Sequence, residues 1–115
     1  MSNEKKSILV IEDDIAQQKF YKMVLESEDY EVALASSIEE AIPFLDSRVY
    51  DLYIVDAILN SGESGTTLID TSYRPMLIIS GLEFENLESV RSLQKPISIE
   101  LLKKTVHNMI YGYDL

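Results

Sequence analysis

Five residues that suit phosphate chemistry stand directly after four short segments that predict strands. The segments are ILVI, LYIV, MLII and RSLQ, and the residues after them are Glu12 with Asp13, Asp56, Ser80 and Lys95. In an open parallel sheet, ligands bind beyond the carboxyl ends of the strands, so we expect these side chains to converge. Three carboxylates, one hydroxyl and one ammonium group in a single pocket indicate metal-assisted phosphoryl chemistry.

The segments between these strands predict helices that hold the strand ends in place. Residues 15–28 carry apolar side chains at helical spacing, and residues 30–35 predict a further strand. Ser37 is followed three residues later by Glu40, and this capping box predicts the start of a second helix. Pro43 should kink that helix.

The second half of the chain predicts shorter elements. Residues 60–65 are rich in Gly, Ser and Asn, which is typical of a loop. Residues 66–73 and 83–89 leave room for about two turns each, so we expect the third and fourth helices to be short. Ser98 caps a longer last helix. The apolar stripe of this helix is formed by Ile99, Leu102, Val106, Met109 and Ile110.

The alternation of strands and helices predicts an α/β fold with a doubly wound, five-stranded parallel sheet. A flavodoxin-like strand order of 2-1-3-4-5 places the first and third strands side by side at the switch point. Glu12 and Asp13 would then lie next to Asp56. The 115 residues, 46% of them hydrophobic, fit one compact domain over residues 1–115.

The carboxylates in this arrangement predict a divalent cation. Acids packed together repel one another unless a cation neutralises them. Magnesium, or manganese in its place, suits Glu12 and Asp13 as ligands, directly or through water. The chain has no cysteine and only one histidine, His107, which argues against a zinc site. We expect Asp14 to cap the following helix instead.

Each remaining residue of the predicted pocket has a chemical role. Asp56 stands alone at its strand end, and a carboxylate there can attack phosphorus and become an aspartyl phosphate. Lys95 could neutralise a phosphoryl oxygen, and the Ser80 hydroxyl could donate a hydrogen bond to another. The backbone N–H groups of Ala57 and Gly81 would complete the cradle.

The motifs ILVIEDD, LYIVD, LIIS followed by Gly, and Lys-Pro resemble the receiver domain of two-component response regulators, and the resemblance covers essentially the whole chain. It implies that Glu12 and Asp13 bind Mg²⁺ together with Asp56 and the backbone carbonyl of Ile58. It also implies that Asp56 accepts a phosphoryl group from a histidine kinase or a histidine phosphotransfer protein.

The resemblance further implies that Ser80 and Lys95 complete the site and that the peptide bond before Pro96 is often in the cis form. Several positions depart from the family pattern. Ser92 stands where many receivers carry a switch aromatic, and the third and fourth helices are shorter than usual, which puts the usual output surface in doubt. Ile58 and Leu82 are apolar at positions that tune hydrolysis in relatives, so we expect slow self-dephosphorylation.

Charge and hydropathy exclude two classes of partner. The formal net charge is −10, from 20 acids and 10 bases, and such a field repels a nucleic-acid backbone. No apolar run reaches the roughly 20 residues that span a bilayer, so we expect no membrane insertion. The first residues lead directly into a strand and not into a signal peptide, which favours a cytoplasmic location.

Three functions fit the sequence to different degrees. The favoured one is a phosphoryl-accepting signalling domain that signals through protein partners, with a phosphorylation-dependent dimer as one form. Such a domain is not an enzyme beyond its own phosphorylation and dephosphorylation. The alternative is a degenerate receiver that acts as a non-phosphorylated interaction module, which Ser92 and the short helices would favour. A magnesium phosphohydrolase is disfavoured, because no acid stands two residues after Asp56 as general acid.

Overall fold

The computed structural model describes residues 5–56, 75–81 and 90–112, with Asp56 and Val90 described by their backbones. The elements within these ranges are β1 (Ser7–Ile11), α1 (Ile15–Ser27), β2 (Glu31–Ala35), α2 (Ile38–Ser47), β3 (Leu52–Asp56), β4 (Met76–Ser80), β5 (Val90–Gln94) and α3 (Ile99–Tyr111). The predicted short helices over residues 66–73 and 83–89, and the loop over residues 60–65, lie outside the described residues.

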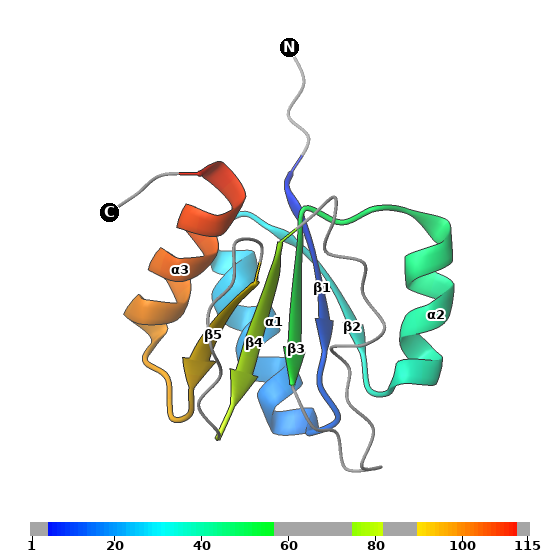
Figure 1. The fold of residues 1–115 in the computed structure, drawn as a ribbon, viewed down its shortest axis with the longest axis horizontal. Helices are drawn as coiled ribbons and strands as arrows, with labels where there is room; N and C mark the ends of the chain where they lie inside the picture. Colours follow the sequence, from blue (N-terminus) through cyan, green and yellow to red (C-terminus); the bar gives the residue numbers. More distant parts are fainter. Residues whose placement is uncertain (1–4, 57–74, 82–89, 113–115) are drawn as a thin grey trace.

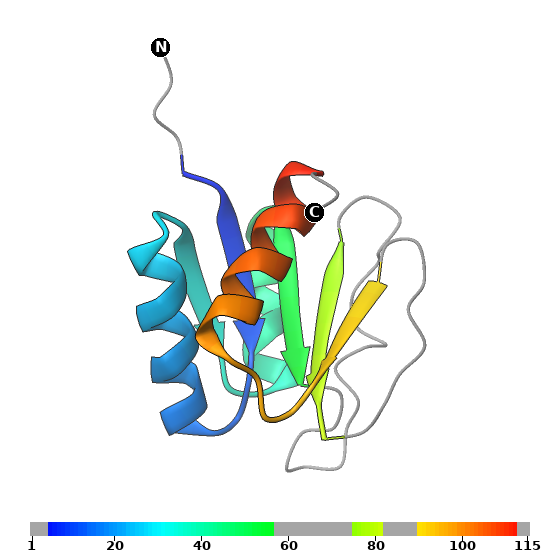
Figure 2. The same cartoon turned by 90° about the vertical axis from the view of Figure 1, so that its left-hand side faces the viewer.

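The strands form one parallel sheet in the order β2-β1-β3-β4-β5, which confirms the predicted arrangement (Figure 1). Helices α1 and α3 lie against one face of the sheet, and α2 lies against the other (Figure 2). The carboxyl ends of the strands therefore open along a single edge, as a doubly wound fold requires.

Strand β1 shows why the apolar run predicted a central strand. All five of its residues are buried. Ile8 and Val10 pack with α1 and α3, whereas Leu9 and Ile11 pack with α2. Because helices cover both faces of a parallel sheet, such a strand needs apolar side chains on both sides.

The helix starts follow the predicted caps. The Asp14 carboxylate accepts from the Gln17 N–H at 3.0 Å at the start of α1. The Ser98 hydroxyl accepts from the Leu101 N–H at 3.1 Å at the start of α3. These bonds satisfy backbone donors that have no partner within the first turn of a helix.

The capping box of α2 forms with one difference. The Ser37 hydroxyl accepts from the Glu40 N–H at 3.1 Å, as predicted. The Glu40 carboxylate reaches back to the N–H of Ser36, one residue earlier than the usual partner. This hydrogen bond holds the pKa of Glu40 below its ordinary value of 4.5. Pro43 lies inside the helix, which continues to Ser47.

Strand boundaries differ from the predicted ones by about one residue. Strand β2 begins at Glu31 and not at Tyr30, because the Tyr30 N–H still bonds to the Leu25 carbonyl of α1 at 3.2 Å. Asp29 in between has a φ of 68°, the left-handed conformation that often follows a helix.

Candidate functional site

The strand register aligns the predicted site residues along one edge of the sheet. Ile11 pairs with Val55, so Glu12 and Asp56 follow at the ends of adjacent strands. On the other side, Asp56 pairs with Ile79 of β4, one residue before Ser80, at which that strand ends. The arrows of β1, β3, β4 and β5 all point to this edge (Figure 1).

Lys95 extends the same edge beyond β5. Ser80 pairs with Gln94, and the Lys95 N–H donates to the Ser80 carbonyl at 2.7 Å. The peptide bond between Lys95 and Pro96 is cis, as the resemblance implied. Ser80 is buried, whereas a third of the Lys95 side chain is exposed to solvent.

Glu12 is a carboxylate that the fold buries almost completely, with 2% of its surface exposed. One carboxylate oxygen accepts from the Asp14 N–H at 3.2 Å, and the other lies 4.0 Å from the Lys95 ammonium nitrogen. Burial of an ionised carboxylate is costly unless charges and donors surround it. The position of Glu12 thus favours positive charge at this end of β1.

The donor set at the end of β1 fits a hard divalent cation. Buried Glu12 and half-buried Asp13 offer neighbouring carboxylates, the ligand type that Mg²⁺ or Mn²⁺ prefers. Among the described side chains, no group of three or more acids, histidines or cysteines could hold a metal ion. The predicted set also needs the Asp56 side chain and the Ile58 carbonyl, and both lie outside that description.

Two backbone groups were predicted to cradle the phosphoryl oxygens. Gly81 is exposed, its carbonyl accepts from the Gln94 side-chain amide at 3.3 Å, and an added Cβ would meet no atom within 4 Å. The space around Gly81 within the described structure is therefore open. Ala57 lies outside the described residues, as does Leu82. Ser92 is half-buried in β5, where it pairs with Ile78.

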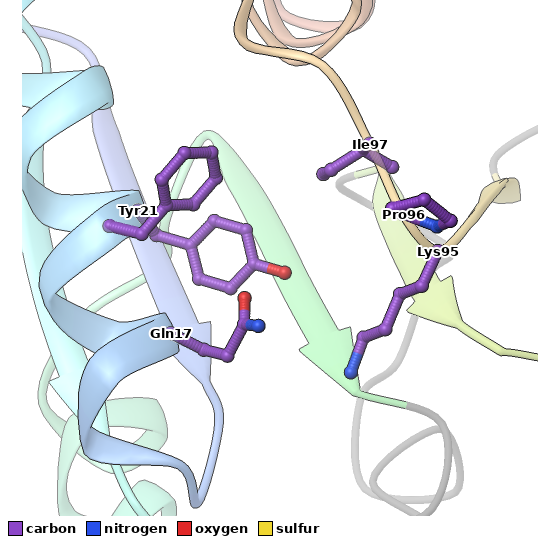
Figure 3. A pocket seen from close by; sticks show the side chains of 6 residues that line it. Gln17, Tyr21, Lys95, Pro96 and Ile97 are labelled. Carbon is purple, nitrogen blue, oxygen red and sulfur yellow. The ribbon is translucent and has the colours of Figure 1, made fainter.

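A pocket that sequence reasoning missed adjoins Lys95. Its volume is about 490 Å³, and it is lined by Gln17, Phe20, Tyr21, Lys95, Pro96 and Ile97. Gln17 and Tyr21 of α1 face Lys95 and Ile97 across the hollow (Figure 3). The sequence placed Phe20 in the apolar stripe of α1, and only the packing of the segment before α3 shows that this stripe continues into a surface pocket.

Within the described ranges, no helix is both long and apolar enough to cross a membrane.

A family model and two solved structures are similar to this chain. The family described as the response regulator receiver domain matches residues 8–107. The receiver domain of the hybrid histidine kinase CckA is 32% identical, with coverage of 90% of this chain and 98% of that chain and a TM-score of 0.78. A two-component response regulator from Clostridium difficile is 25% identical, with coverage of 93% and 97% and a TM-score of 0.78.

One curated relative is longer than this chain. The transcriptional regulatory protein YvrH of Bacillus subtilis (strain 168) is 41% identical over 69 residues, which are 57% of this chain. The matched segment spans 29% of that protein, so the similarity covers less than a third of its length.

Proposed function

The chain belongs to the receiver domain family of two-component response regulators, and on this premise we propose that Asp56 accepts a phosphoryl group from a phosphohistidine donor in a Mg²⁺-dependent reaction. The donor would be a histidine kinase or a histidine phosphotransfer protein. The phosphorylated domain would then act on a protein partner.

The observation that carries this proposal is the pairing of buried Glu12 with Lys95 at the strand edge where Asp56 ends β3. The two charged groups are 4.0 Å apart, although they come from opposite ends of the sequence. A purely structural ion pair has no need of this location. Ligands of doubly wound sheets bind at this edge, which supports a role in phosphoryl transfer.

The proposed reaction is a single displacement at phosphorus. An Asp56 carboxylate oxygen forms the new P–O bond as the P–N bond of phosphohistidine breaks, and the electron pair of that bond returns to the imidazole. When bound by Glu12 and Asp13, Mg²⁺ would supply positive charge to the phosphoryl oxygens. Lys95 would neutralise a further oxygen, and the Ser80 hydroxyl would donate a hydrogen bond.

The pocket beside Lys95 supports docking of the donor. Its wall includes Phe20, Tyr21 and Ile97, so it offers an apolar surface next to the reacting edge. An apolar side chain of the donor in this pocket would bring its phosphohistidine toward Asp56. Such positioning lowers the entropic cost of transfer between two proteins.

The test is to weigh the intact protein after treatment with Mg²⁺ and a small phosphodonor. We expect the wild type to gain one phosphoryl group and Asp56→Asn to gain none, and a chelator should prevent the gain. Asp46→Asn, which changes an exposed acid of α2, serves as the matched control and should behave as wild type. Equal modification of Asp56→Asn would contradict the proposal, and an unmodified wild type would favour the non-phosphorylated interaction module.

A further inference from the structure

The side chain of Gln18 contacts the backbone between the two predicted metal ligands. Gln18 lies near the start of α1, and its side-chain amide group donates to the backbone carbonyl of Glu12. The ladder between β1 and β2 ends at Ile11, and the Glu12 N–H then bonds to the Ala35 carbonyl at 2.9 Å. The Glu12 carbonyl lies beyond that ladder, and a buried carbonyl needs a donor from elsewhere.

This hydrogen bond fixes a particular peptide plane. The Glu12 carbonyl belongs to the peptide unit that joins Glu12 to Asp13, and a peptide unit is planar. A donor that holds this oxygen therefore limits rotation of the whole peptide unit. The unit includes the Cα atoms of Glu12 and Asp13, so the hydrogen bond restricts the positions from which both carboxylates project.

Two further hydrogen bonds order the same short loop, one within the loop and one from α1. The Asp14 N–H donates to the Glu12 carboxylate at 3.2 Å, and the Gln18 N–H donates to the Asp14 carbonyl at 2.9 Å. Gln18 is thus bonded to the loop through both its backbone and its side chain. The neighbouring Gln17 differs, because its side chain lines the pocket beside Lys95.

We propose that Gln18 is a positioning residue for the acidic pair, which keeps the carboxylates of Glu12 and Asp13 presented to Mg²⁺. This inference rests on the proposed function. Groups that orient metal ligands without touching the metal typically contribute 10- to 100-fold to metal affinity. We therefore expect loss of the Gln18 amide to weaken Mg²⁺ binding about 10-fold.

The experiment compares matched changes at Gln18 and Gln17. Isothermal titration calorimetry gives the Mg²⁺ dissociation constant of Gln18→Ala, Gln18→Glu, Gln17→Ala and Gln17→Glu. Gln18→Glu is the sharpest variant, because it adds a negative charge near the cation but removes the donor. If the Gln18 amide positions the acidic pair, Gln18→Glu weakens Mg²⁺ binding. Gln17→Glu adds the same charge but leaves the Gln18 donor in place, so it leaves Mg²⁺ binding unchanged or tightens it.

Two other measurements separate positioning from a loss of structure. At saturating Mg²⁺, phosphorylation of Gln18→Ala by the small donor should return to the wild-type rate, because only the metal concentration needed has changed. In metal-free protein, hydrogen exchange of the Asp14 amide should become faster in Gln18→Ala and not in Gln17→Ala.

Failure of the two proposals is distinguishable. Equal Mg²⁺ affinities and equal Asp14 exchange in Gln18→Ala and wild type would overturn the positioning role alone, as would tighter binding by Gln18→Glu. A wild type that takes up no Mg²⁺ would overturn the metal-dependent function and this inference together.

Discussion

Glu12 and Lys95 bring opposite charges together at the candidate site. With its carboxylate buried and its partner ammonium 4.0 Å away, Glu12 depends on positive charge nearby. Lys95→Met keeps the aliphatic stem but removes that charge. We expect it to lower the free energy of unfolding of the metal-free protein by about 1 kcal/mol, since Lys95 is a third exposed and the interaction is partly screened.

Urea unfolding of a double-mutant cycle with Glu12→Gln measures this interaction. In the Glu12→Gln background, Lys95→Met should cost little, because the side chain that the Lys95 ammonium group faces at 4.0 Å then carries no charge. Saturating Mg²⁺ should also reduce the cost in the otherwise wild-type protein. Additive losses in the two single variants would show that the pair is not coupled.

At this scale the sequence predicted residue types and strand ends but not side-chain contacts. Ser80 and Lys95 were identifiable because each directly follows a predicted strand. Gln18 was not, since its bond to the Glu12 carbonyl depends on how a three-residue loop turns into α1. The pocket at Phe20 was missed for a similar reason, because the path of the segment after Lys95 forms one wall of it.

At the scale of single elements, the cap of α2 makes stability depend on pH. The Ser36 N–H donates to the Glu40 carboxylate and lowers the pKa of Glu40 in the folded protein. Ionised Glu40 therefore stabilises the folded state relative to the unfolded chain. This contribution is fully present above the unfolded-state pKa of 4.5 and is lost as the pH falls through the lower folded-state value. Glu40→Gln keeps an acceptor for Ser36 and should flatten the acid side of the stability profile.

Urea midpoints measured from neutral to acidic pH provide the check. Ser37→Ala is the companion variant, because it removes the other half of the cap, and we expect it to cost about 1 kcal/mol at every pH. An acid-side profile that is the same in Glu40→Gln and wild type would rule out this origin of the pH dependence.

The same elements show how far sequence patterns determine a fold. Buried runs such as residues 8–11 predicted central parallel strands, because only apolar side chains can pack on both faces. The handedness of crossover connections restricted the possible strand orders, and the observed order is the flavodoxin-like one among them. The first residue of β2 could not be predicted in the same way. It depends on the left-handed conformation of Asp29 and on the hydrogen bond from the Tyr30 N–H to α1, and apolar periodicity carries no information about either.

At the scale of the whole molecule, the net charge of −10 and the acidic strand edge predict that cations stabilise the fold in two distinct ways. Any salt screens the repulsion among surface acids. Mg²⁺ bound at Glu12 and Asp13 would add a specific term, because a ligand that binds only the folded state stabilises it by RT ln(1 + [L]/Kd). This term is about 2.7 kcal/mol when the Mg²⁺ concentration is 100 times Kd.

Thermal unfolding at constant ionic strength isolates the specific term. When MgCl₂ replaces NaCl, the melting temperature of the wild type should rise steadily with the logarithm of the Mg²⁺ concentration. Asp13→Asn should lose most of that rise, because it removes a carboxylate of the pair, whereas Asp46→Asn changes the net charge equally on exposed α2 and should keep it. A rise of the same size in all three proteins would mean that Mg²⁺ acts only on the general charge of the molecule, and the acidic pair would then have no special affinity for the ion.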